Sequence, residues 1–324
     1  MENYEQEVVK GDSQTFWIMR TQYIFSIVNA ELRFGQLYNY RDGVPINYSK
    51  CVVSLRKDYA QEGGSVSGAG ITLTNSWLTL GNGTLLDATC DKMWKGITVG
   101  TGSTLVADGA SFKNAYKAID IQSNASVDNV ISHCSFYNNY YGIVNNKSGV
   151  FSFTDNTFDS DFNTMAKPFD ANGNSNHRNA FAFSFAHLSL GDGVVTNAAT
   201  QISGNHFNRG LYGIYAGIES TVKAHGNSFD NCYLASVRLA NEAIGQPHSI
   251  TGATDLNMKI PNVLTIPDRI NDAPFAYDGE WASVSSSLGL TDGKTSFGIL
   301  GFGDFPITGL QITGNTITGA GPDA

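Results

Sequence analysis

The stretch NHFNRGLYGI, from Asn205 to Ile214, contains a phrase that the chain repeats: Asn-x-Phe, followed a few residues later by Tyr-Gly-Ile. Further copies are Cys134-Ser135-Phe136 with Tyr141-Gly142-Ile143, Asn156-Thr157-Phe158, Asn227-Ser228-Phe229, Asn315-Thr316-Ile317 and the degraded Ala110-Ser111-Phe112. Successive phenylalanines are 24, 22, 49 and 22 residues apart, so one turn of the repeat is widened. A fixed period in the twenties indicates stacked supersecondary units.

Short segments between the phrases alternate apolar with small polar residues. Examples are Gly96-Ile97-Thr98-Val99 and Ala118-Ile119-Asp120-Ile121. Alternation with a period of two places one side of a strand in the core and the other in solvent. Strands this short are stable only when each pairs with the equivalent strand of the next repeat. The pattern therefore predicts an all-β chain that forms a parallel β-solenoid with coils of roughly 22–24 residues.

Each residue of the repeated phrase has a structural role in such a solenoid. We expect the Asn side chain to satisfy backbone groups at a corner and to stack on the Asn of the next coil. The Phe should form an internal aromatic column. The Gly of Tyr-Gly-Ile should allow a tight bend before the next strand. These roles make the repeated residues poor candidates for chemistry.

The chain is expected to divide into two parts. Residues 1–62 form a non-repeat N-terminal segment or cap. Residues 63–324 form the parallel β-helix, as the solenoid is also called, with irregular insertions near 159–180 and 240–305. A fresh repeat begins at Ile312 and stops within the repeat. An uncapped sheet end is an aggregation template, so we expect the chain to belong to a longer protein.

Charge and hydropathy exclude several partners. The net charge is −9 with only 20 Lys plus Arg, which argues against a nucleic-acid partner. The apolar stretch from Phe16 to Val28 is interrupted by polar residues and is too short to span a membrane. The acidic start is unlike a signal peptide. The chain is therefore either intracellular or a piece of a longer secreted protein, and the unfinished last repeat favours the second alternative.

The four cysteines do not have metal-ligand spacing. They are Cys51, Cys90, Cys134 and Cys232, without a C-x-x-C pair, and their disulfide state stays open. Cys134 occupies the slot that Asn fills in other repeats, and we interpret it as a small buried replacement.

One segment resembles a known family. The run from Cys90 to Val99, CDKMWKGITV, is followed by Gly102–Val106 and by Ala118-Ile119. It resembles the right-handed parallel β-helix repeats of secreted and cell-surface proteins of the Bacteroidota, which are similar to pectate lyases in fold and are often type IX secretion substrates. The resemblance covers roughly residues 68–240 and the last dozen residues. It implies a right-handed parallel β-helix and a secreted or cell-surface location, but no particular activity.

The sequence does not contain an identifiable catalytic constellation. Paired Asp-Asp and Gly-His-Gly motifs are missing, and Asp120, Asp128 and Asp155 stand singly near strand ends. The sequence therefore favours a structural, adhesive or glycan-contacting scaffold whose partner is a polysaccharide or another cell-surface component. An alternative stays open: a lyase or glycoside hydrolase that acts on an acidic or neutral glycan in a groove along the helix.

A first candidate site is a calcium loop. Asp159, Asp161 and Asn163, with Asp170 at the twelfth place, imitate the oxygen ligands of an EF-hand. The match is incomplete, because Thr164 stands where a Gly is needed. An exposed acidic loop is the alternative interpretation. The fold itself requires no cofactor, and Ca²⁺ is the ion that this pattern suggests.

A second candidate site joins aromatic and acidic residues. Tyr277, Asp278, Glu280 and Trp281 lie together in the irregular region. Aromatic rings beside acids suit stacking on a sugar ring, whereas an aromatic clamp that closes a loop onto the helix would have the same pattern.

Overall fold

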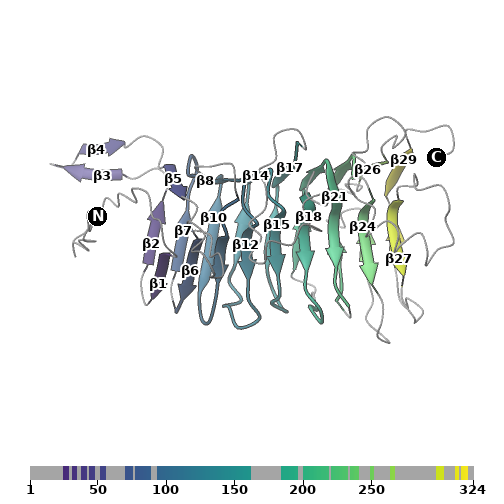
Figure 1. The fold of residues 1–324 in the computed structure, drawn as a ribbon, viewed down its shortest axis with the longest axis horizontal. Helices are drawn as coiled ribbons and strands as arrows, with labels where there is room; N and C mark the ends of the chain where they lie inside the picture. The colour runs from purple at the N-terminus through teal and green to yellow at the C-terminus, as the bar shows by residue number, and fades with distance from the viewer. Residues whose placement is uncertain are drawn as a thin grey trace, which may run out of the picture.

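The strands of this protein stack side by side in coils along its long axis, with β1 at one end of the solenoid and β27 at the other (Figure 1). The structure is a computed structural model. It describes residues 25–28, 31–34, 38–41, 44–47, 52–55, 70–75, 77–88, 93–161, 184–195, 200–218, 220–232, 234–240, 249–251, 263–266, 297–302, 311–313 and 315–319. Side chains are described only from residue 71 onward.

Three parallel sheets form the walls of the solenoid. The first sheet contains β1 (Phe25–Val28), β6 (Gly70–Thr74), β9 (Gly96–Val99), β12 (Lys117–Ile121), β15 (Tyr141–Asn145), β18 (Ser184–Leu190), β21 (Gly210–Ala216), β24 (Ala235–Ala240) and β27 (Phe297–Phe302). The second contains β2 (Glu31–Phe34), β7 (Trp77–Leu80), β10 (Thr104–Asp108), β13 (Val130–Ser132), β16 (Ser152–Thr154) and β19 (Gln201–Ser203). A three-stranded sheet of β22 (Lys223–Ala224), β25 (Ser249–Thr251) and β28 (Gln311–Thr313) continues it.

The third sheet contains β5 (Val52–Leu55), β8 (Leu85–Ala88), β11 (Ser111–Lys113), β14 (Ser135–Tyr137), β17 (Thr157–Asp159), β20 (His206–Asn208), β23 (Ser228–Asp230), β26 (Val263–Ile266) and β29 (Thr316–Gly319). Each coil thus gives one strand to each sheet before the chain climbs to the next coil. This arrangement confirms the predicted all-β parallel solenoid. Among the described residues, no helix is long and apolar enough to cross a membrane.

The N-terminal residues also supply strands. Strands β1, β2 and β5 pair in parallel with β6, β7 and β8, although residues 1–62 lack the repeated phrase. Between β2 and β5 the chain forms an antiparallel pair, β3 (Tyr38–Arg41) and β4 (Val44–Asn47). Most of the expected insertion near 159–180 lies outside the described residues. Within the expected insertion at 240–305, strands β25, β26 and β27 extend the three walls.

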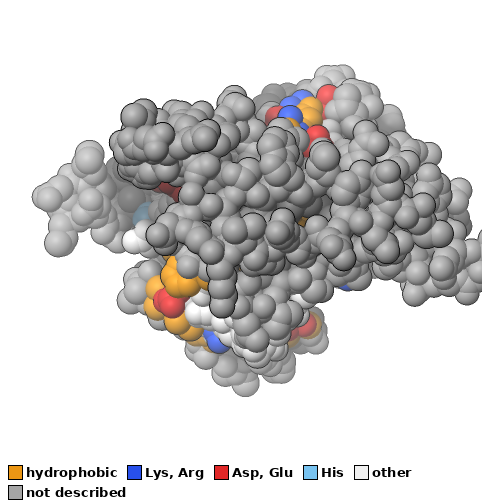
Figure 2. Space-filling model, turned by 90° about the vertical axis from the view of Figure 1, so that its left-hand side faces the viewer, with side chains coloured by type: hydrophobic (Ala, Val, Ile, Leu, Met, Phe, Trp, Pro, Cys, Tyr) orange, Lys and Arg blue, Asp and Glu red, His pale blue; other side chains and the backbone are white. Residues whose placement is uncertain are grey.

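The described side chains in view at the N-terminal end of the solenoid mix hydrophobic, acidic and basic types (Figure 2).

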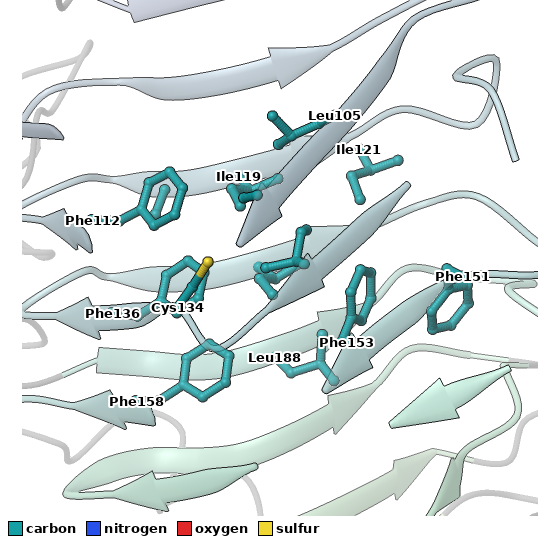
Figure 3. Close-up of a cluster of buried hydrophobic side chains, with 14 of the residues drawn as sticks. Leu105, Phe112, Ile119, Ile121, Cys134, Phe136, Phe151, Phe153, Phe158 and Leu188 are labelled. Carbon is teal, nitrogen blue, oxygen red and sulfur yellow. The ribbon is translucent and has the colours of Figure 1, made fainter. Parts of the chain in front are cut away.

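The phenylalanines of the repeat form the predicted internal column (Figure 3). Ring centroids of Phe112, Phe136, Phe158, Phe207 and Phe229 follow one another at 4.9, 4.6, 4.9 and 4.8 Å, with nearly parallel planes. All five are almost fully buried. The spacing equals the distance between neighbouring strands, about 4.8 Å, because each ring stands on its own strand of the third sheet. Burial of such rings is a main stabilising term of the solenoid.

The asparagines of the repeat form the predicted ladder. Asn156 donates through Nδ2 to Oδ1 of Asn205, and Asn205 donates in the same way to Asn227, both at 3.0 Å. Each side-chain oxygen also accepts the backbone N–H of the preceding rung, as Asn156 does for Cys134 at 2.9 Å. Cys134 is a buried free thiol in the ladder, as expected from its slot. The ladder satisfies backbone groups at a corner where no strand partner could.

The glycine of Tyr-Gly-Ile has a different role from the predicted one. Gly142 and Gly213 lie inside strands β15 and β21, not at a bend, and neither has a positive φ. A Cβ on Gly142 would lie 2.4 Å from the carbonyl oxygen of His187 and 2.8 Å from the ring of Phe158. A Cβ on Gly213 would lie 2.6 Å from the ring of Phe229. The glycine therefore makes room for the phenylalanine column, and the bend prediction is wrong.

Candidate functional site

The flank of the first sheet carries an aromatic surface outside the main core. In β21, Ile214 and Ala216 point into the solenoid and are fully buried, whereas Tyr215 between them is partly exposed. Near the start of β12, β15, β18, β21 and β24, one residue of each strand lies at the same level, namely Lys117, Tyr141, Ala186, Tyr212 and Ala235. Ala186, Tyr212 and Ala235 belong to a second buried cluster, separate from the core, and Tyr141, Phe185 and Tyr215 pack against it.

We name six of these rings the flank cluster: Tyr116, Tyr140, Tyr141, Phe185, Tyr212 and Tyr215. Tyr116 and Tyr140 stack at 5.4 Å, and Tyr141 meets Tyr140 edge to face at 4.9 Å. Phe185 continues the row, 5.3 Å from Tyr141 and 5.5 Å from Tyr212. The rings therefore touch one another continuously from the coil of β12 to the coil of β21. Contacts of this kind fix ring orientation, so the surface is rigid before any ligand arrives.

Part of the flank cluster is accessible. Tyr212 is fully buried and Tyr140 is 7% exposed, whereas Tyr116, Tyr141, Phe185 and Tyr215 are partly exposed. A half-buried tyrosine offers an apolar ring and a polar hydroxyl at the same surface. This combination suits a ligand that is itself amphipathic.

Polar side chains border the rings at both ends of the row. At one end, Lys117 Nζ lies 3.2 Å from Asp120 Oδ2, and Asn146 Nδ2 donates to Asp120 Oδ1 at 3.4 Å. At the other end, the Arg238 guanidinium lies 4.0 Å from the centroid of Tyr215 and donates to the carbonyl oxygen of Ala216. Glycoside hydrolysis needs two carboxylates, and among the described outward positions of the first sheet Asp120 is the one carboxylate. The described flank thus combines partly exposed aromatic rings with polar and charged side chains.

The calcium prediction finds no support in the described half of its loop. Asp159 ends strand β17, where Arg209 Nε donates to its Oδ1 at 2.8 Å, Arg209 Nη2 contacts its Oδ2, and Asn208 adds a bond at 3.0 Å. The Asp159 carboxylate also raises the pKa of Arg209, chiefly through this hydrogen bond. Asp161 donates its backbone N–H to Asn138. Asn163 and Asp170 lie outside the described residues. Asp159 is thus committed to an arginine 50 residues away rather than presented to a cation.

The second candidate site, Tyr277, Asp278, Glu280 and Trp281, lies outside the described residues and stays a prediction. The flank cluster, in contrast, was missed by sequence reasoning. Its signal is a pair of bulky residues just before the buried strand positions, as in Tyr140-Tyr141 and Leu211-Tyr212. Such a pair breaks the alternation of period two, because its side chains pack with the second cluster at the corner between the third and the first sheet and not in the core.

Two histidines stand on the outside of the third wall. His133 adopts a left-handed conformation (φ 51°), with Nδ1 at 2.8 Å from Asp108 Oδ1 and Nε2 at 3.8 Å from Asp155 Oδ2. The hydrogen bond to Asp108 raises the pKa of His133 and lowers the pKa of Asp108. The Nδ1 atom of His206 lies 2.6 Å from Ser228 Oγ and 3.5 Å from Asp230.

Three other side chains that could bind a metal, His187, Cys134 and Cys232, are buried in the interior of the solenoid. The imidazole of His187 lies between Phe158 and Phe207, with Nε2 at 2.7 Å from the carbonyl oxygen of Asn208. Burial lowers the pKa of His187 to about 4. Burial also raises the pKa of the Cys134 and Cys232 thiols to about 12. These groups are therefore neutral at physiological pH.

The fold and the flank define a parallel β-helix scaffold with an aromatic surface on one side. The family described as "Periplasmic copper-binding protein (NosD)" matches residues 5–180, more than half of the chain, and the chain belongs to this family. A search of curated proteins and a search of solved structures each found no match. The Bacteroidota origin and type IX secretion that the sequence resemblance implied stay predictions.

The copper in the family description does not fit the donor groups that the structure describes. Among the described residues, no group of three or more His, Cys, Asp or Glu side chains could hold a metal ion. The imidazoles and thiols above lie apart and already have partners in the fold. The described coils thus provide a scaffold without a recognisable metal centre.

Proposed function

We propose that this chain is a non-catalytic β-helix scaffold that binds an extended glycan along the flank of its first sheet. The observation that carries the proposal is the flank cluster, whose partly exposed rings recur from coil to coil. Coils are about 4.8 Å apart, so a polymer that crosses them meets a new side-chain level at each step. Sugar rings stack their apolar faces on aromatic rings, while their hydroxyls bond with polar side chains such as Lys117, Asp120 and Asn146.

A location outside the cytoplasm supports this proposal. The family is described as periplasmic, and we propose that this member is secreted or displayed at the cell surface. Only 15% of its residues are charged, a low share that leaves Ser, Thr, Asn and Gly to cover the surface. Glycans are abundant partners in that environment.

Affinity electrophoresis tests the proposal with a panel of neutral and acidic polysaccharides in native gels. We expect the parent protein to be retarded by at least one polysaccharide, and Tyr141→Ala to lose most of that retardation. Tyr137→Ala is the matched control, because Tyr137 is partly exposed on the third sheet, away from the flank cluster. It should migrate like the parent.

Two results would contradict the proposal. Equal retardation of Tyr141→Ala and Tyr137→Ala would remove the flank from the binding surface. Release of new reducing ends, or of unsaturated products, from any bound polysaccharide would favour the lyase or hydrolase alternative over a scaffold.

A further inference from the structure

We infer that the described coils between residues 70 and 240 do not hold copper, although the chain belongs to a family described as copper-binding. Their imidazoles and thiols serve to hold the coils together. This inference is independent of the glycan proposal, because it concerns the other walls and the interior of the solenoid.

A copper site needs two or more donors that converge on one point. Cu(II) takes imidazole nitrogens and oxygens in a tetragonal arrangement, and Cu(I) takes soft sulfur ligands. The donors must also be free of protons, which means neutral imidazole and thiolate. Convergence, occupation and protonation therefore decide whether the described donors could bind copper.

The histidines do not converge. His133 precedes β14 and His206 lies in β20, and β17 separates these two strands in the third sheet. Two strand spacings amount to about 10 Å. His206 also lies level with Ser135, two residues beyond His133, and its Nδ1 is directed further along the sheet, to Ser228 of β23. The two imidazoles therefore do not face one common point. His187 packs against the rings of Phe158 and Phe207 in the interior. The fourth described histidine, His225, is partly exposed at the corner before β23, three residues before Ser228, which is the residue level with His206.

Four of the ring nitrogens also have partners in the fold. Both ring nitrogens of His133 face carboxylates, those of Asp108 and Asp155. Nδ1 of His206 is bonded to Ser228, and Nε2 of His187 is bonded to the carbonyl oxygen of Asn208. A copper ion would have to break these contacts one at a time, without gaining a second imidazole.

The two described cysteines are separate and protonated. Cys134 lies next to β14 and Cys232 follows β23, three strands further along the third sheet. Both are almost fully buried, and the Cys134 thiol is 3.1 Å from the carbonyl oxygen of Ser132. A thiol with a pKa raised to about 12 supplies almost no thiolate at neutral pH.

Copper titration of the full chain tests the inference. The apo protein would be loaded with Cu²⁺, and separately with Cu⁺ under reducing conditions, and then desalted. Bound copper would be measured by elemental analysis, and affinity by competition with a chromogenic chelator. The variants are a triple His133→Asn, His206→Asn, His225→Asn chain and the single variants Cys134→Asn and Cys232→Ala. Asn suits position 133, because it tolerates a positive φ, and position 134, because Asn fills this slot in other coils.

We expect these variants to bind the same amount of copper as the parent, whether the parent binds none or one ion per chain. If the parent binds one ion, its affinity for copper should change less than threefold in each variant. Circular dichroism spectra would verify that each variant is folded. A tenfold or greater loss of affinity, or the loss of a stoichiometric ion, in any folded variant would overturn the inference. For loaded Cu²⁺ protein, an unchanged electron paramagnetic resonance spectrum in the triple variant provides a second reading of the same expectation.

Discussion

At the scale of single residues, one position on the first sheet shows how the phenylalanine column constrains its neighbours. The slot beside the column holds Gly142 in β15, His187 in β18 and Gly213 in β21. The imidazole of His187 fills the space that is left empty beside the glycines. It also requires Gly210, since a Cβ there would lie 2.6 Å from His187 Nε2. The residue types in this slot are therefore set by contacts between coils.

Gly213→Ala should destabilise the protein by about 1–3 kcal/mol, because the added methyl would collide with the Phe229 ring and with the carbonyl oxygen of Ser236. Urea unfolding of parent and variant measures this difference. Gly193→Ala is the control for Gly-to-Ala effects at a position with open space, although its positive φ adds some strain. A smaller loss for Gly213→Ala than for Gly193→Ala would contradict the packing explanation.

The buried imidazole of His187 should make stability fall in mild acid. Its pKa is lowered from 6.5 to about 4, so between these values the unfolded chain binds the proton that the folded chain refuses. The free energy of unfolding therefore has its full value above pH 6.5. It decreases progressively as pH falls to 4, by roughly 3 kcal/mol in total. Urea midpoints at pH 7.5, 6, 5 and 4.5 measure this loss.

His187→Ala is the matched variant, because Ala118 occupies the same slot in another coil. It should be less stable at pH 7.5 but should lose less stability on acidification than the parent. His133→Asn is a control in which the pH dependence has the opposite sign. The raised pKa of His133 stabilises the folded protein below pH 6.5, and this stabilisation disappears as pH rises through the pKa of His133 in the folded state. An identical acid slope in parent and His187→Ala would rule out His187 as the cause.

At the scale of elements, strands of two to seven residues are stabilised by pairing with the strand at the same level in the next coil. Side chains at the corners complete the bonding, since the ladder of Asn156, Asn205 and Asn227 replaces strand partners where the second wall meets the third. The ion pair of Asp159 with Arg209 ties β17 to the end of β20 on the outside. Side chains at the corners thus supply part of the stabilisation that long strands provide in other folds.

Asn205→Ala should cost about 2–5 kcal/mol, because it leaves the buried N–H of Asn156 and the carbonyl oxygen of Phe153 without their side-chain partner. Thermal and urea unfolding would measure the loss. Asn124→Ala is the matched control, since the Asn124 side chain bonds with Thr101 at an exposed turn and should cost less than about 1 kcal/mol. Equal losses for the two variants would show that the ladder adds nothing beyond a surface hydrogen bond.

At the scale of the whole molecule, the solenoid is a one-dimensional stack. Its nine-stranded sheets run the length of the described chain, and within each sheet a strand pairs only with the strands of the neighbouring coils. The interior is filled by repeated columns, such as Ile97, Ile119, Ile143, Leu188 and Ile214 at one level of the first sheet. Function is therefore expected on the outside, where side chains differ from coil to coil, and the flank cluster is the most distinct such surface among the described residues.

The sequence by itself determined the solenoid, the phenylalanine column and the asparagine ladder. These features depend only on residues that recur at a fixed period, and a period is visible without coordinates. The tertiary structure decided the features that depend on which different residues lie at the same level in neighbouring coils. These features are the space beside Phe229 that requires Gly213, the pairing of Asp159 with Arg209, and the strands before residue 62. It also decided the flank cluster, because its rings come from four coils and meet only when the coils are stacked.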